Sequence, residues 1–374
     1  MKDKNPFFQK KVKAIEVNKP PIPEYQAILA SQKTELPIRA GYKSISQLLK
    51  EMEDTGFQGR KLGEAAAVWE RMLKDKDLTI VLGYAGSLST TGQWKIINWL
   101  MENRFIDVLV STGANISEDI VEAMGASYWK GDHLADDNAL FTAEINRYYD
   151  VYGYEPDYGR MTDLIVDCIK NLDPKHPYST REFLTELGKF LSGKGINSIV
   201  AQAYLSKVPV FSPALVDSAY GEAILLAKNK GFDLILDQAK DFKEFMGLAE
   251  KIKRTGVIYV GGGVPKDFIQ LIAVSSALAY PERKIPGRED GRFRGSDPYH
   301  YYPHQYAIQF TGDDPKWGGL SGCTFDEATS WGKEVKAAND VQCFCDATIA
   351  LPIVTHALNE RIDFKREVID YFKK

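Results

Sequence analysis

Val257-Ile258-Tyr259-Val260 runs directly into Gly261-Gly262-Gly263-Val264-Pro265. The four apolar residues, three of them β-branched, predict a short buried strand. The glycines permit a tight turn and a close approach of the backbone to an anion, and Pro265 suits the first turn of a following helix. The free N–H groups at the start of such a helix attract phosphate. The stretch therefore predicts a strand, a turn and a helix, the unit from which nucleotide-binding α/β sheets are built.

The same unit recurs along the chain from about residue 78. Near-continuous apolar runs, which indicate strands covered on both faces, occur at residues 78–82, 106–110, 198–201, 208–211, 232–236, 257–260, 306–310 and 341–344. Segments with apolar residues at helical spacing occur at 117–124, 219–228, 240–253 and 267–278. Strands that alternate with helices predict an α/β fold. We expect a single large, doubly wound, mostly parallel sheet of the Rossmann-like kind, with helices on both faces.

Three regions do not follow this alternation. Residues 1–45 are polar and contain Lys19-Pro20-Pro21-Ile22-Pro23, which predicts an irregular N-terminal arm, because adjacent prolines favour extended backbone. Residues 127–195 are rich in aromatic side chains and predict a helical insertion. Residues 281–304 are polar and rich in glycine and proline, which is typical of a surface loop or lid. Residues 46–374, which include this insertion and this loop, are expected to form one domain.

Composition excludes several classes of protein. The 374 residues contain 47 Lys and Arg against 51 Asp and Glu, so the chain lacks the basic character of a general nucleic-acid binder. No apolar run approaches the roughly 18 residues of a membrane span, and no apolar leader is visible. The spacing of Cys168, Cys323, Cys343 and Cys345 is not that of a zinc site or a disulfide scaffold. We expect a cytoplasmic globular protein without bound metal.

Two further turns resemble the glycine turn after residue 260. They are Gly83-Tyr84-Ala85-Gly86-Ser87 and Ser111-Thr112-Gly113-Ala114-Asn115, the second followed by Ser117 as the expected cap of a helix. Each turn alone is compatible with an ordinary strand-to-helix connection, and none has the G-x-G-x-x-G spacing. Because parallel strands end at one edge of a sheet, the three turns together favour a nucleotide site. Asp346 follows another strand and is expected to cap a helix there.

A lysine near the C-terminus has unusual neighbours. Residues 326–333 read Asp-Glu-Ala-Thr-Ser-Trp-Gly-Lys. A lysine becomes a carbonyl-reactive nucleophile where desolvation or a nearby cation lowers its pKa. Trp331 can supply apolar cover and a face for a cation, and Glu327 a carboxylate for a second amine. From spacing alone, however, the ordinary interpretation of Lys333 is a solvated surface charge after a helix start.

Six segments, taken together, resemble the deoxyhypusine synthase family. They are Asp54–Gln58, Leu82–Tyr84, Asp107–Thr112, Pro209–Leu215, Gly261–Lys266 and Asp326–Lys333. They occur in the family's order between about residues 46 and 360. The resemblance implies a transferase that uses NAD to oxidise spermidine and holds an aminobutyl unit as an imine on a lysine. The unit then passes to an acceptor amine and the retained hydride reduces the new imine. The resemblance also implies a homotetramer with NAD sites between paired subunits.

Residue roles follow from the resemblance, position by position. Lys333 matches the imine-forming lysine and Trp331 the aromatic wall of the amine pocket. Glu327 and Glu222 match carboxylates that bind the substrate. The positions that correspond to the NAD site are Gly86, Ser87, Thr112, Gly113, Ala114, Glu118, Asp217, Gly261, Gly262, Gly318, Ser321, Asp346 and Ala347.

Departures from the family pattern leave the substrate open. Asp267 stands where the family has a histidine that assists catalysis, and Trp317 and Leu320 replace two acids. Leu320 cannot pair with an ammonium, so spermidine would lose a contact worth roughly 1.5–3 kcal/mol. The sequence therefore predicts an aminoalkyl transfer from a small amine or polyamine to an acceptor that is either a small amine, as in homospermidine-forming relatives, or a protein lysine. Two alternatives are an NAD-dependent amine oxidoreductase and a non-catalytic NAD-binding oligomer.

Overall fold

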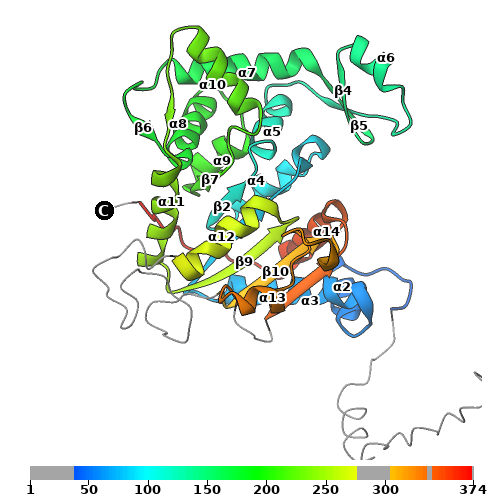
Figure 1. Ribbon diagram of the computed structural model, residues 1–374. Helices are drawn as coiled ribbons and strands as arrows, with labels where there is room; N and C mark the ends of the chain where they lie inside the picture. Colours follow the sequence, from blue (N-terminus) through cyan, green and yellow to red (C-terminus); the bar gives the residue numbers. More distant parts are fainter. Residues whose placement is uncertain (1–37, 276–303, 335–338, 373–374) are drawn as a thin grey trace, which may run out of the picture. The chain divides into compact units, whose positions relative to one another are not determined.

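The computed structural model describes residues 38–275, 304–334 and 339–372. They form a six-stranded sheet in the order β11-β10-β9-β1-β2-β7, in which all neighbouring strands are parallel (Figure 1). The strands are β1 (Leu78–Tyr84), β2 (Val108–Ser111), β7 (Val210–Phe211), β9 (Arg254–Val260), β10 (Tyr306–Thr311) and β11 (Asp340–Phe344). The predicted doubly wound α/β sheet is confirmed. The arm expected at residues 1–45 and the loop expected at 281–304 lie almost entirely outside the described residues.

Helices cover both faces of this sheet, because the side chains of each strand point alternately to the two sides. Val81, Val257 and Tyr259 belong to one apolar cluster, with residues from α11 (Gln238–Gly247) and α12 (Gly263–Ser275). Residues such as Ile80 and Leu82 belong to a second, larger cluster on the opposite face. The helices that contribute to that cluster include α2 (Ile45–Glu53), α3 (Phe57–Lys74), α4 (Trp94–Glu102), α5 (Asn115–Ala123) and α14 (Ala347–Arg361).

The chain reverses its direction of progress across the sheet at β1. From β1 it proceeds outward to β2 and β7, and then crosses to the other side of β1, where β9 pairs with it from Leu78↔Arg254 to Tyr84↔Val260. A crevice outside the carboxyl ends of two such strands is the usual ligand site of open α/β sheets. At this switch point the loop after β1 is joined to the end of β9, because the Ala85 N–H donates to the carbonyl of Val260 at 3.0 Å.

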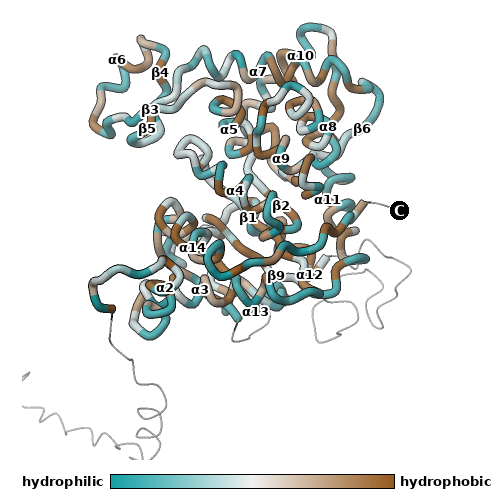
Figure 2. Tube along the Cα trace, turned by 180° about the vertical axis from the view of Figure 1, so that it is seen from behind, coloured by the Kyte–Doolittle hydropathy of each residue, from teal (hydrophilic) through white to brown (hydrophobic). Residues whose placement is uncertain are grey.

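The insertion predicted at residues 127–195 contains helices, but also a small sheet that the sequence did not predict. Its antiparallel strands lie in the order β3-β5-β4, away from the main sheet in both Figure 1 and Figure 2. The elements of this part are β3 (Tyr128–Lys130), α6 (Asp137–Thr142), β4 (Ile145–Tyr148), β5 (Val151–Tyr154), α7 (Glu155–Ile169), β6 (Pro177–Tyr178) and α8 (Thr180–Gly193).

Three local predictions are wrong. Residues 198–201 begin a helix, α9 (Ile199–Ser206), because the Ser198 hydroxyl accepts a hydrogen bond from the Ala201 N–H and caps it. Only Ile235–Leu236 of the predicted strand 232–236 is extended, as β8, and it pairs with β6 outside the main sheet. Ser117 does not cap a helix, since α5 has already begun at Asn115 and the Ser117 hydroxyl donates to the carbonyl of Ala114. The predicted helix at 219–228 is α10 (Ala219–Asn229).

Candidate active site at the carboxyl edge of the sheet

The glycine turn after β9 is tightly enclosed. Gly261 has a φ of 75° and Gly263 a φ of 55°, values that favour glycine. A Cβ atom on Gly262 would lie 2.4 Å from the Cα of Ser321, and one on Gly261 would lie 3.3 Å from the Cβ of Ala85. Side chains at either position would therefore press on the loop after β1 or on the segment around Ser321. The glycines let three loops converge beside the switch point between β1 and β9.

Several of the residues predicted to bind the cofactor lie in contact with one another. The Thr112 hydroxyl donates to the carbonyl of Gly86 at 2.9 Å, which joins the turns after β2 and β1. The Ser87 hydroxyl lies 2.7 and 2.6 Å from the two carboxylate oxygens of Glu118. The Gly263 N–H donates to the Ser321 hydroxyl at 3.0 Å. Glycine turns, polar side chains and the N-termini of α5 and α12 thus meet at one edge, an arrangement that fits a dinucleotide.

Glu118 is a deeply buried acid of this edge, with 6% of its surface exposed. Burial raises its pKa to about 7, and the hydrogen bond from Ser87 lowers it in part. The adjacent Asp119 is fully buried, and burial raises its pKa to about 7 as well, although it accepts a hydrogen bond from the Ile199 N–H. Both carboxyls can consequently exist in the neutral form near physiological pH.

Other residues assigned to the cofactor by resemblance lie apart from these contacts. Asp346 caps α14, since its side chain accepts hydrogen bonds from the N–H and the hydroxyl of Thr348, as the sequence predicted; Ala347 begins that helix. Gly318, Asp217 and Glu222 are exposed. Asp217 and Glu222 flank the start of α10, and the structure does not bring them to Lys333. Trp317 is 74% exposed.

Lys333 owes its position to the end of a short helix, α13 (Phe325–Ser330). The Thr324 side chain caps its start by accepting from the Glu327 N–H at 3.1 Å. At its end the Gly332 N–H donates to the carbonyl of Thr329 and the Lys333 N–H to that of Ala328, both at 3.0 Å. These two bonds form a Schellman motif, which requires a left-handed residue, and Gly332 supplies it with a φ of 75°. The motif turns the chain back toward the sheet, so that Lys333 points inward.

The Lys333 amine lies between a carboxylate and an indole. Its nitrogen donates to Oδ1 of Asp267 at 2.8 Å and lies 5.0 Å from the centre of the Trp331 ring. Only 11% of the Lys333 side chain is exposed, against 49% of Asp267. Asp267 sits one turn into α12, so the glycine turn that begins this helix also fixes the carboxylate that meets the lysine.

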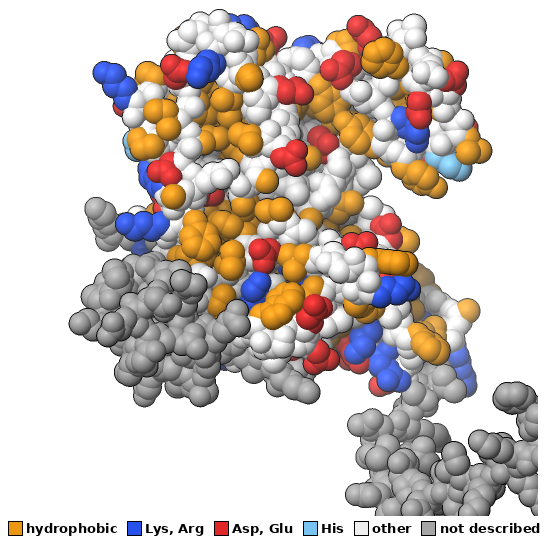
Figure 3. All heavy atoms as spheres, viewed as in Figure 1, with side chains coloured by type: hydrophobic (Ala, Val, Ile, Leu, Met, Phe, Trp, Pro, Cys, Tyr) orange, Lys and Arg blue, Asp and Glu red, His pale blue; other side chains and the backbone are white. Residues whose placement is uncertain are grey.

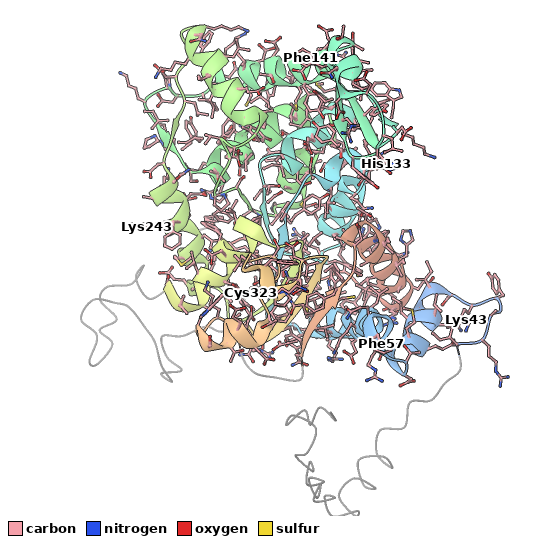
Figure 4. All side chains as sticks on the ribbon, turned by 45° about the vertical axis from the view of Figure 1, so that its right-hand side comes forward. Lys43, Phe57, His133, Phe141, Lys243 and Cys323 are labelled. Atoms are coloured by element: carbon pink, nitrogen blue, oxygen red, sulfur yellow. The ribbon has the colours of Figure 1, made fainter. Side chains whose placement is uncertain are left out.

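A second lysine, Lys266, points into the protein interior and was not recognised from the sequence. It is fully buried, and its nitrogen donates to the Gln309 side chain at 2.8 Å and to the carbonyl of Cys323 at 2.7 Å. Burial lowers its pKa to about 8. The Gln309 amide in turn donates to the carbonyls of Gly261 and Ser321, both at 2.8 Å. Cys323, whose carbonyl accepts from Lys266, is labelled in Figure 4. Lys266 and Gln309 thus connect the glycine turn at Gly261 to the segment that contains Ser321 and Cys323.

The residue after the nucleophile candidate is also anchored in the interior. Glu334 is 1% exposed; burial raises its pKa well above the usual range, and it accepts a hydrogen bond from Gln270 at 3.3 Å. The backbone N–H of His304 donates to the carbonyl of Lys333 at 3.2 Å. His304 is buried against Thr255, with 2.8 Å between Nδ1 and the hydroxyl, and burial lowers its pKa to about 3. One feature of the sequence indicates these buried polar residues: Gln309 interrupts an otherwise apolar strand.

A doubly wound sheet with glycine turns at its switch point and a shielded lysine at the same edge defines a Rossmann-like α/β protein. The chain belongs to the deoxyhypusine synthase family, since the family model of that description matches residues 47–358. This confirms the resemblance found in the sequence. Members of the family are transferases, and the chain is accordingly a transferase.

Relatives at 37–45% identity agree with this assignment. The chain is 45% identical over 328 residues to a probable deoxyhypusine synthase 2 of Methanosarcina mazei, covering 87% of this chain and 90% of the relative. It is 45% identical to the probable deoxyhypusine synthase 2 of Archaeoglobus fulgidus over 82% and 95% of the two chains. A deoxyhypusine synthase-like protein of Chlorobaculum parvum is 37% identical over 83% and 85%.

The fold is also similar to that of a crystal structure of a putative deoxyhypusine synthase from Entamoeba histolytica. The TM-score is 0.57 and the identity 16%, over 88% of this chain and 99% of that chain. At this identity the likeness concerns the fold alone. Within the described ranges, no helix combines the length and the apolar character needed to cross a membrane.

Proposed function

We propose that this chain is an NAD-dependent aminoalkyl transferase in which Lys333 carries the transferred unit as an imine. The observation that supports this proposal is the position of the Lys333 amine, shielded from water and in contact with Asp267 and Trp331 beside the glycine turns. An amine with an acid–base partner in a desolvated pocket is what nucleophilic catalysis on an imine carbon requires.

Asp267 and Lys333 have different roles in the proposed reaction. Bound NAD would accept a hydride from the carbon next to the donor nitrogen and later return it to the product imine. Asp267 takes a proton from Lys333, and the neutral amine adds to the imine carbon of the oxidised donor, R–CH=N–R′. Departure of R′–NH2 leaves R–CH=N–Lys333. An acceptor amine then adds to the same carbon and displaces Lys333, which leaves the product imine. Return of the retained hydride to this imine would end the sequence without net oxidation.

Residues from both sides of the switch point would hold NAD. They include the hydrogen-bonded pairs Thr112–Gly86 and Ser87–Glu118, and Ser321, which accepts from the Gly263 N–H. The adjoining turns add Gly261, Gly262, Gly113 and Ala114. Glu327, within the helix that precedes Lys333, and Trp331 would bind the donor amine. The proposal assigns a small amine or polyamine as donor, and a small amine or a protein lysine as acceptor.

The exposed members of the predicted site suggest an assembly. Asp217, Glu222 and Gly318 do not reach Lys333 within this chain, yet they match substrate and cofactor positions of the family. A homotetramer with sites between paired subunits would bring such residues to a neighbouring copy. We include this assembly, the organisation into an arm (1–45) and an NAD-binding catalytic domain (46–374), and a cytoplasmic location in the proposal.

Reductive trapping tests the proposed reaction. The enzyme is incubated with NAD and a panel of amines and treated with borohydride, and its mass is then measured by mass spectrometry. We expect an adduct whose mass identifies the transferred group, its loss in Lys333→Arg, and its retention in Lys316→Arg, an exposed lysine paired with Asp314. Steady accumulation of NADH without an adduct indicates an amine oxidoreductase instead. Tight NAD binding without amine-dependent chemistry indicates a non-catalytic protein.

A further inference from the structure

We propose that the donor amine of this enzyme carries an apolar tail, so that an alkyl- or aryl-substituted monoamine is preferred over a polyamine. This inference rests on the proposed function, because it concerns the donor side of the same lysine. It depends on a cavity that adjoins the Lys333–Asp267 pair. The cavity has a volume of about 400 Å³ and is lined by Gly263, Val264, Asp267, Phe268, Leu271 and Leu320.

One face of α12 forms most of this cavity. Val264, Asp267, Phe268 and Leu271 are spaced at i, i+3, i+4 and i+7, which places them along one side of a helix. Leu320, from the loop that also contains Ser321, supplies another wall. Apolar side chains gather over α12 and the adjoining elements in Figure 3. A chain of carbon atoms bound along this helix would start at Asp267 and Lys333 and continue over Val264, Phe268 and Leu271.

The charges of the cavity fit a single cation near the lysine. Among the described residues that line it, Asp267 is the one acid, and its Oδ1 atom already accepts a hydrogen bond from Lys333. A second ammonium farther along the cavity would face the side chains of Leu271 and Leu320, which cannot accept a hydrogen bond. An ammonium held against these side chains gives up water contacts and gains no partner, whereas an alkyl group in the same place gains from burial.

The exposure of the apolar walls agrees with this role. Val264 is 50% exposed although it lies at the start of a largely buried helix, and Leu320 is partly exposed. Exposed apolar side chains that gather beside a reactive group commonly mark a binding site. An apolar donor tail would cover both residues, while a polyamine would leave them in contact with charge.

A matched pair of amines tests the inference. Hexylamine and 1,6-diaminohexane have the same chain length and differ only in the terminal ammonium. We expect the wild-type enzyme with NAD to form the borohydride-trapped adduct roughly 10-fold or more faster with hexylamine. From propylamine to hexylamine, we expect the rate at limiting concentration to rise roughly fourfold per methylene.

A variant pair sharpens the test. Leu320→Asp places a carboxylate in the cavity and should shift the preference toward the diamine by roughly 10-fold, while the uncharged control Leu320→Asn should not. An equal or faster reaction of the wild-type enzyme with the diamine overturns the inference and leaves the proposed function intact. If neither amine gives an adduct while NAD binds, the proposed function itself fails.

Discussion

Lys266 and Lys333 are two lysines near one edge of the sheet, yet they have opposite surroundings. Lys266 is fully buried and donates to neutral oxygens of Gln309 and Cys323. Lys333 retains some exposure and contacts the carboxylate of Asp267 beside an indole. Burial alone therefore does not single out a candidate nucleophile, because the amine of the buried Lys266 is bound by neutral oxygens of the interior. What distinguishes Lys333 is an adjoining cavity and a partner that can take its proton.

The loss of stability should differ most between alanine substitutions of the two lysines. Lys266→Ala should lower the free energy of unfolding by about 3–4 kcal/mol, because it opens a cavity and removes a donor in the interior. Lys333→Ala, which removes an ion pair with a half-exposed partner, should cost less than about 1 kcal/mol. Urea denaturation measures both. Lys266→Met, which keeps the apolar stem, serves as the matched control. Equal losses for the two alanine variants would show that Lys333 is structural as well.

The second effect concerns pH. Burial lowers the pKa of Lys266 to about 8 in the folded protein, below the usual 10.5. Between these values the unfolded chain binds more protons than the folded one, so stability from this group rises with pH from about 8 to about 10.5. The gain is on the order of 3 kcal/mol. Other groups titrate in the same range, so the measurement is the difference between wild type and Lys266→Met. A difference that does not change with pH would contradict the described environment of Lys266.

The smallest effect tests how Lys333 is placed. Gly332→Ala puts a Cβ on a residue with a φ of 75° and should cost about 1–2 kcal/mol. Because the Schellman motif directs Lys333 inward, trapping should slow at least tenfold in this variant. Gly195→Ala, with a φ of 74° in the turn after α8, is the matched control and should lose stability without losing the adduct. Normal trapping in Gly332→Ala would mean that the lysine finds its position without the turn.

The sequence predicted the sheet well for a physical reason. Strands buried on both faces are continuous apolar runs, and six such runs became β1, β2, β7, β9, β10 and β11. A four-residue apolar run can equally begin a buried helix, which is why residues 198–201 were misassigned. The small sheet at β3, β4 and β5 lies largely in partly exposed aromatic sequence, where apolar periodicity is weak.

The sequence allowed prediction of those candidate-site residues that belong to recognisable motifs. Lys333, Trp331 and Asp267 were singled out, and the structure brings them together. The buried residues Lys266 and Gln309 were not singled out. A lysine in a helix is ordinarily exposed, and nothing in the sequence marks Lys266 as the inward-pointing neighbour of Asp267. Asp217 and Glu222 remain assigned by resemblance alone.

The proposed reaction requires that Lys333, and not Lys266, holds the transferred unit. Peptide mapping of the protein after incubation with NAD and an amine donor, followed by borohydride reduction, locates this unit. We expect the added mass on the peptide that contains Lys333 and its disappearance in Lys333→Arg, while the peptide that contains Lys266 stays unmodified. An adduct that persists in Lys333→Arg, or that maps to Lys266, would overturn the role proposed for Lys333.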